Sequence, residues 1–128
     1  MKKIKEVTPS EAFSMTKNGA LLVDVREPRE VAGKAFDAPG TLQVPMSQFG
    51  QRFQEIPSDR KVIVACNTGS RSMMAARLLS NQGYRNIVNL QHGIVRWEQE
   101  GLPVRMMEKQ NSLSWLQKLL GKAARTAS

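Results

Sequence analysis

The sequence predicts an α/β fold in which a mostly parallel β-sheet is covered by helices on both faces. Apolar runs rich in β-branched residues recur at 20–26, 61–65 and 86–90, as expected for strands that are buried on both faces. Segments with helical spacing and helix-capping residues separate these runs. Strands that alternate with helices in this way form right-handed crossovers and a parallel sheet.

The first half of the chain starts with a short strand and a helix. Thr8, Pro9 and Glu11 indicate the helix start, because a capping hydroxyl precedes a proline and an acid in the first turn. Asn18 and Gly19 are typical of its end. The elements expected up to residue 56 are a strand at 4–7, a helix at 8–18, a strand at 20–26, a short helix at 27–32, a loop at 33–40, a strand at 41–45 and a helix at 46–56.

The second half continues the alternation. We expect a strand at 61–65, a helix at 72–80, a strand at 86–90 and a helix at 93–98. Ligand sites in parallel sheets lie beyond the carboxyl ends of the strands. Cys66 occupies such an end, and so do Asp24 and Arg26.

Composition describes a basic protein with one cysteine. The 128 residues suffice for one domain with a hydrophobic core, and the net charge is +8. A single cysteine excludes an internal disulfide, a multi-cysteine zinc site and a CxxC pair, and it indicates a reducing compartment. The N-terminal residues do not resemble a signal peptide, and no apolar run reaches membrane-spanning length. We therefore expect a cytoplasmic protein.

The single cysteine begins the stretch C-N-T-G-S-R-S at 66–72, between a strand and a helix. A helix N-terminus leaves about four backbone N–H groups without partners inside the helix, and its dipole is positive there. Gly69 permits a left-handed backbone, and Arg71 carries a permanent charge that suits a second anion. We therefore expect a Cys66 thiol whose pKa is lowered, because its surroundings favour the thiolate.

These residues resemble the rhodanese family of single-domain sulfurtransferases. The stretch at 66–72 matches the family pattern C-x-x-G-x-R-S, and L-L-V-D-V-R-E-P at 21–28 matches its first signature. The stretch N-L-Q-H-G-I-V-R-W-E-Q-E-G-L-P-V at 89–104 is similar to its closing signature. The three signatures occur in the family order. The resemblance implies a doubly wound fold with a five-stranded parallel sheet.

The resemblance also implies a chemistry at residues 66–72, hereafter the active loop. Cys66 would take a sulfane sulfur from a donor such as thiosulfate or a persulfide and pass it to a thiol or cyanide acceptor. Arg71 would hold donor oxygens or organise the loop, while Asp24 and Arg26 would support the site from the neighbouring strand. The backbone N–H groups of Asn67, Thr68, Gly69, Ser70, Arg71 and Ser72 would hold the persulfide. No metal or cofactor is expected.

The chain departs from the family at two places. Residues 33–40 replace a shorter turn, so Lys34 stands where the family has a histidine. His92 stands where the closing signature has a glycine. We interpret His92 as a solvated surface residue, with a contact at the rim of the site as the alternative.

Three other interpretations of the active loop compete with sulfur transfer. A Cys-based phosphatase or arsenate reductase loop has five residues between its cysteine and arginine, whereas four separate Cys66 from Arg71. A non-catalytic rhodanese-like module that only binds partners would be expected to have lost the cysteine. A structural core cysteine would explain Cys66 but not the glycine, the arginine and the small polar residues that follow it.

The sequence divides into a domain at 1–105 and a basic extension at 106–128. Residues 111–125 have an apolar face and a basic face at helical spacing. Such a helix docks on its own domain or on a second copy in a homodimer, or it lies on an anionic membrane surface. Binding to a membrane surface would place the protein at the inner face of a membrane. We expect no nucleic-acid binding, because the basic residues lack interleaved aromatics.

Overall fold

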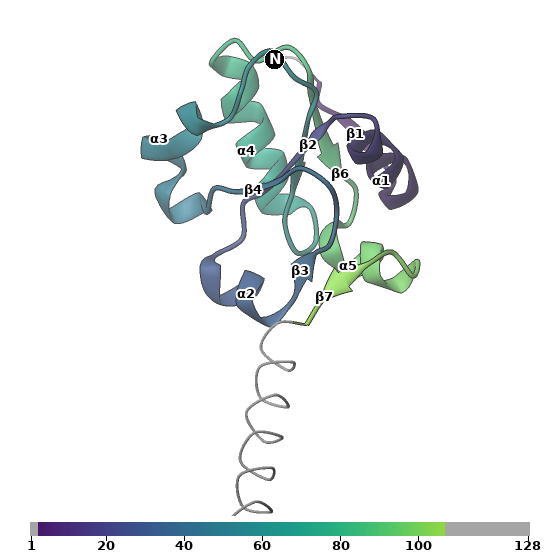
Figure 1. Cartoon of the computed structure of the whole chain (residues 1–128). Coiled ribbons are helices and arrows are strands. Elements are labelled where there is room, and N and C mark those ends of the chain that lie inside the picture. The colour runs from purple at the N-terminus through teal and green to yellow at the C-terminus, as the bar shows by residue number, and fades with distance from the viewer. Residues whose placement is uncertain (1–2, 107–128) are drawn as a thin grey trace, which may run out of the picture.

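The computed structural model describes residues 3–106, and the helix predicted at 111–125 lies outside them. A five-stranded sheet in the order β1-β6-β5-β2-β4 forms the centre of the fold (Figure 1). Every neighbouring pair of strands in it is parallel. The strands are β1 (Lys5–Val7), β2 (Leu21–Asp24), β4 (Thr41–Gln43), β5 (Val62–Ala65) and β6 (Ile87–Leu90). The predicted five-stranded parallel sheet is confirmed.

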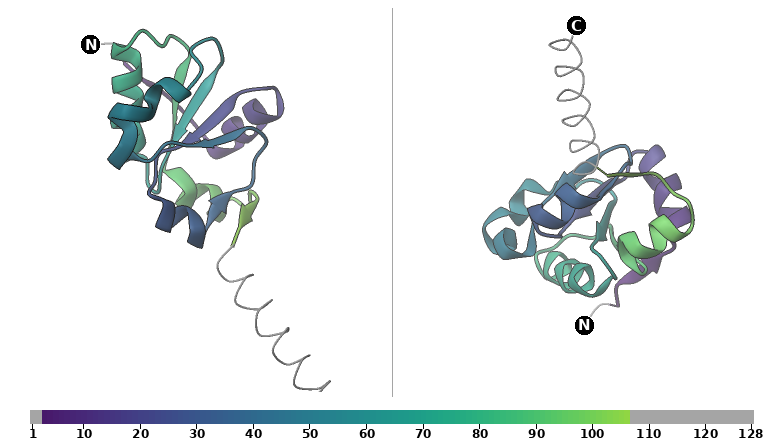
Figure 2. Two further views of the ribbon diagram at one scale, coloured as in Figure 1. Left: turned by 60° about the vertical axis from the view of Figure 1, so that its left-hand side comes forward. Right: turned by 90° about the horizontal axis from the view of Figure 1, so that it is seen from below.

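Helices cover both faces of the sheet (Figure 2). Residues of α1 (Pro9–Lys17) and α5 (Gly93–Gln99) pack on one face, and residues of α3 (Phe49–Arg52) and α4 (Ser70–Asn81) pack on the other. The short helix α2 (Pro28–Gly33) follows the carboxyl end of β2. The predicted doubly wound architecture is therefore confirmed. Among residues 3–106, no helix combines the length and apolar character that crossing a membrane requires.

Alternation along the central strands divides the core into two clusters. In β5, Val62 and Val64 face the α3 and α4 side, whereas Ile63 and Ala65 face the α1 and α5 side. Side chains in a strand point to opposite faces with a period of two. Cys66 continues the first series, so its side chain belongs to the α4 face of the sheet.

Two segments differ from the expectation. The stretch 33–40, expected as a loop, contains β3 (Ala35–Phe36), which pairs antiparallel with β7 (Val104–Arg105) in a separate two-stranded sheet. The helix expected at 46–56 is broken into a 3₁₀ turn at Met46–Gln48, the short α3 and a second 3₁₀ turn at Phe53–Glu55. A 3₁₀ turn keeps nearly the same apolar spacing as an α-helix, so the pattern did not distinguish them.

Trp97 fixes α5 against the rest of the domain. Its ring is fully buried and makes edge-on contacts with Phe13 of α1 and Phe36 of β3, at 5.5 and 5.2 Å between centroids. Its indole N–H donates to the Pro103 carbonyl at 2.9 Å. The segment that leads into β7 is thereby tied to α5.

Gly93 allows α5 to begin against the loop that follows β5. Its φ is +57°, and a Cβ at this position would overlap the carbonyl oxygens of Cys66 and Asn67. Gly101 also has a positive φ, of +78°, but a Cβ there would meet nothing within 4 Å. Substitutions at the two glycines therefore distinguish the cost of a left-handed backbone, which both share, from the cost of close packing, which only Gly93 has.

We predict that Gly93→Ala destabilises the protein more than Gly101→Ala does. Left-handed backbone alone costs an alanine about 1–2 kcal/mol, which both variants suffer. Overpacking against the loop backbone adds about 1–3 kcal/mol in Gly93→Ala only. Urea unfolding of both variants measures the difference. Equal losses would show that α5 does not need this close approach.

Candidate active site

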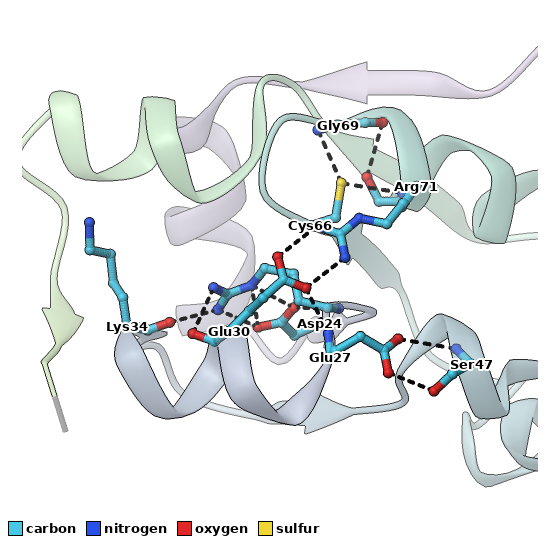
Figure 3. Close-up of polar contacts among 10 residues, drawn as sticks. Asp24, Glu27, Glu30, Lys34, Ser47, Cys66, Gly69 and Arg71 are labelled. Carbon is cyan, nitrogen blue, oxygen red and sulfur yellow. Dashed lines mark hydrogen bonds and ion pairs between the residues drawn. The ribbon is translucent and has the colours of Figure 1, made fainter. Parts of the chain in front are cut away.

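The active loop lies at the carboxyl end of β5, where the structure directs backbone N–H groups at the Cys66 sulfur (Figure 3). The N–H of Gly69 donates to Sγ at 3.1 Å, and the N–H of Ser72 donates at 3.4 Å. Gly69 has φ +107° and precedes the first residue of α4. The left-handed glycine bends the chain back over the sulfur, which explains why glycine is suited to this position.

Two opposing effects set the ionisation of Cys66. Burial raises the pKa of its thiol, because the charged form loses water. Hydrogen bonds from the Ser72 hydroxyl and from the N–H groups of Ser72, Gly69 and Thr68 lower the pKa by more. The net result is a thiol whose pKa lies below its ordinary value, in the direction that the sequence predicts.

Cys66 is only 1% exposed, but its surroundings are not those of a core cysteine. A structural cysteine in an apolar core would have a raised pKa and no donors at its sulfur. Here Sγ accepts from two N–H groups, and the neighbouring residues Asn67, Thr68 and Ser70 are exposed. The sulfur is therefore buried beneath residues of the loop that are themselves exposed.

Helix α5 holds the carbonyls of the active loop away from the sulfur. The N–H of Ile94 donates to the Cys66 carbonyl at 3.0 Å, and the N–H of Val95 donates to the Asn67 carbonyl at 3.2 Å. Carbonyl oxygens that pointed at the site would repel a thiolate. Their engagement by α5 leaves the N–H groups as the polar atoms that face Sγ.

Asn89 of β6 is a site residue that the sequence analysis missed. Its side chain is fully buried, and its amide nitrogen donates to the Gly69 carbonyl at 3.2 Å. The same carbonyl accepts from the Met73 N–H at 3.1 Å. The Ser72 hydroxyl is within hydrogen-bond reach of both this carbonyl and the Cys66 sulfur, and it donates its one hydrogen to one of them at a time. Because a trans peptide is planar, a Gly69 carbonyl held by the buried Asn89 also fixes the direction of the Ser70 N–H, on the opposite side of the same peptide.

A sequence signal for Asn89 existed. It is the one amide in the otherwise apolar run at 87–90, and a buried polar side chain needs hydrogen-bond partners. Its amide also donates to the Glu6 carboxylate at 3.2 Å. Its oxygen Oδ1 is buried without a partner among the described residues, so holding the loop in this way costs some stability.

Arg71 contacts a carboxylate of α2 rather than projecting freely. Its two terminal nitrogens donate to the two oxygens of Glu30 at 2.7 and 2.8 Å (Figure 3). This paired hydrogen bonding to Arg71 lowers the pKa of Glu30 to about 2. The structure thus places Arg71 as a link between the active loop and α2.

Asp24 and Arg26 form a buried ion pair beneath α2. The Asp24 carboxylate accepts from the Arg26 guanidinium at 2.8 Å, and both side chains are almost fully buried. Arg26 also donates to the Lys34 carbonyl at 2.9 Å, at the end of α2. These two residues therefore position α2, and α2 in turn holds Arg71 through Glu30.

Neither departure from the family pattern donates a hydrogen bond to the sulfur, although the His92 backbone packs against Gly69 of the active loop. Lys34 pairs with Glu98 and so joins the end of α2 to α5. His92 is exposed and precedes α5 with a left-handed backbone at φ 61°. Both agree with surface or structural roles. Within residues 3–106, no three histidine, cysteine, aspartate or glutamate side chains gather in a way that could hold a metal.

Comparison with known proteins assigns the chain to a family. The family model for the rhodanese-like domain matches residues 8–100. The chain is 44% identical over 84 residues to a protein of Allochromatium vinosum named sulfurtransferase, covering 66% of this chain and 77% of the relative. It is 34% identical over 102 residues to the thiosulfate sulfurtransferase GlpE of Haemophilus influenzae, covering 78% and 93%.

A solved structure agrees with the sequence matches. The rhodanese-related protein of Thermoplasma volcanium superimposes with a TM-score of 0.71 at 28% identity, over 80% of this chain and 98% of that one. The family match spans strands β2, β4, β5 and β6 of the sheet, the active loop and α5. On these grounds the chain belongs to the rhodanese-like domain family and is related to sulfurtransferases.

Proposed function

We propose that this protein is a sulfurtransferase that carries a sulfane sulfur on Cys66 as a persulfide. The observation that supports this most is the convergence of backbone N–H groups on a sulfur with a lowered pKa, at the start of a helix. The relatives named as sulfurtransferases support the reaction class.

Loading begins with attack by the Cys66 thiolate on the outer sulfur of a donor such as thiosulfate. The new Cys66–S bond forms as the sulfur–sulfur bond of thiosulfate breaks, and sulfite leaves with the bonding electron pair. No proton moves in this step, so no general base is required. The loop supplies a thiol whose pKa is lowered, which favours the thiolate that attacks the donor.

The persulfide anion is stabilised by the loop backbone. The N–H groups of Ser70 and Arg71 belong to the first turn of α4 and have no partners within that helix. With the Gly69 carbonyl held by Asn89, the Ser70 N–H faces the outer sulfur. Preorganised donors of this kind stabilise the anion without reorganisation during the reaction.

Unloading transfers the outer sulfur to an acceptor. A thiolate or cyanide attacks that sulfur, the Cys66 sulfur leaves as thiolate, and the acceptor departs as a persulfide or thiocyanate. Because Cys66 leaves as the hydrogen-bonded thiolate, the donors that promote loading also promote unloading. Donor and acceptor use the same sulfur in turn, which gives ping-pong kinetics.

Phosphatase chemistry is the weaker alternative. Such a reaction needs an acid that protonates the leaving group. Two carboxylates act on Arg71 of the active loop: Glu30, which Arg71 holds ionised, and Glu27, which accepts hydrogen bonds from Ser47. The loop also has four residues between cysteine and arginine, which suits one sulfur better than a phosphoryl group.

We predict that Cys66→Ser abolishes sulfur transfer, because a serine hydroxyl cannot form the persulfide. Wild-type protein treated with thiosulfate should gain the mass of one sulfur atom and lose it on addition of cyanide. Ser70→Ala, which keeps the loop backbone, serves as the control and should still load. Full transfer by Cys66→Ser would contradict the assigned nucleophile.

We predict that Ser72→Ala and Asn89→Leu both raise the pKa of Cys66. The first removes a hydroxyl that lowers the pKa, and the second releases the Gly69 carbonyl. The thiolate fraction rises with pH through the pKa, so the pH midpoint of alkylation by iodoacetamide should move upward in both variants.

The control for this measurement is Val23→Ala, which leaves a cavity in the same core cluster but removes none of the hydrogen bonds of the loop. Its alkylation midpoint should equal that of the wild type. A midpoint shift of the same size in Val23→Ala would mean that general loosening, rather than lost hydrogen bonds, explains the result.

We predict that Glu30→Gln lowers the free energy of unfolding by up to about 1 kcal/mol near neutral pH, a size typical of a partly exposed ion pair. Because folding depresses the pKa of Glu30 from 4.5 to about 2, its stabilisation is complete above pH 4.5 and disappears as pH falls through about 2. The difference between wild type and variant in urea unfolding should shrink over that range. A difference that is constant with pH would contradict the assignment.

A further inference from the structure

A cavity of about 320 Å³ lies between α2 and α5, beside the active loop. Asn67, the residue after Cys66, lines it with an exposed side chain. Ile94 lines it as well, and the N–H of Ile94 is bonded to the Cys66 carbonyl at 3.0 Å. A molecule in this cavity would therefore lie against the loop that carries the reactive sulfur.

The two walls of the cavity differ in character. On the α5 side, Ile94 and Val95 present hydrocarbon, and Val95 is 41% exposed. On the α2 side the lining is charged and includes Arg29, Glu30 and Lys34. An occupant that matches both walls has an apolar part and a charged part.

The sign of that charge follows from the ion pairs around the cavity. Glu30 is neutralised by Arg71, Lys34 by Glu98, and the buried Arg26 by Asp24. Arg29 is exposed, and no carboxylate of residues 3–106 forms an ion pair with it. The cavity thus carries one uncompensated guanidinium, which favours a carboxylate on the occupant.

We propose that this cavity binds the acceptor, and that the acceptor is a small thiol that carries a carboxylate on a hydrocarbon frame. This inference rests on the proposed sulfur transfer. Thiosulfate and cyanide have no hydrocarbon to place against Ile94 and Val95. The volume lies at the lower end of the range for small-molecule sites, which is roughly 300–1,000 Å³. A small thiol therefore fits better than a folded protein.

The step that this acceptor performs is balanced without a further reactant. Its thiolate attacks the outer sulfur of the Cys66 persulfide, and a sulfur–sulfur bond to the acceptor forms as the bond to Cys66 breaks. Cys66 leaves as thiolate, and the acceptor leaves as its own persulfide. Arg29 is a specificity-determining residue in this scheme, because it binds the carboxylate and takes no part in the bond changes.

The test measures the discharge of sulfur-loaded protein by two thiols. Mercaptosuccinate carries carboxylates on a short hydrocarbon chain, and monothioglycerol is a neutral thiol of similar size. Each second-order rate constant is compared between variant and wild type, so the intrinsic reactivity of each thiol cancels. The protein is loaded with thiosulfate and checked by intact mass before the thiol is added.

Arg29→Glu should slow discharge by mercaptosuccinate roughly fivefold to tenfold, which is the size expected for reversing one exposed charge. Discharge by monothioglycerol should be unchanged, because this thiol has no carboxylate. Added salt should reduce the difference. Val95→Asp, which places a carboxylate on the opposite wall, should also slow discharge by mercaptosuccinate. Both substitutions lie on the surface, and an acid in the first turn of α2 is compatible with that helix.

The control is Arg85→Glu, which makes the same change in net charge in the turn before β6, at the opposite end of the strands. It should leave both rate constants unchanged. Equal slowing of mercaptosuccinate by Arg85→Glu and Arg29→Glu, or equal effects of Arg29→Glu on both thiols, would overturn the acceptor site. Failure of the wild type to load with sulfur would instead overturn the proposed function.

Discussion

The structure depends on one balance, between the burial of the Cys66 sulfur and the hydrogen bonds that reach it. Burial alone would keep the thiol protonated and inert. Hydrogen bonds from the N–H groups of Gly69 and Ser72 and from the Ser72 hydroxyl outweigh burial, so the pKa of the buried thiol is lowered rather than raised. Apart from the Ser72 hydroxyl, the donors are backbone groups at a helix start, and their positions are therefore set by the fold.

Much of the surrounding structure keeps those backbone groups in place. From one side, α5 binds the carbonyls of Cys66 and Asn67, and Gly93 permits its close approach. From below, Asn89 fixes the Gly69 carbonyl. From the other side, a chain of contacts runs from Asp24 through Arg26 to α2, and from Glu30 to Arg71. Each contact orients a part of the active loop without touching the sulfur.

The sequence predicted the sheet and singled out Cys66 because both leave local signals. Buried parallel strands are continuous apolar runs, and a cysteine between such a strand and a helix has few structural explanations. Pairing between β3 and β7 joins residues far apart in the chain, and no local pattern reveals it. The partner of Arg71 was missed for the same reason, since Glu30 lies 41 residues away in the chain. Asn89 had a local signal, but its contact with Gly69 became evident only in three dimensions.

The most direct test of the central claim is a crystal structure of the protein after treatment with thiosulfate. We predict one additional sulfur bonded to Cys66 Sγ, lying toward the N–H groups of Ser70 and Arg71. A loaded sulfur that points away from these groups, or a Cys66 that remains unmodified while transfer proceeds, would contradict it.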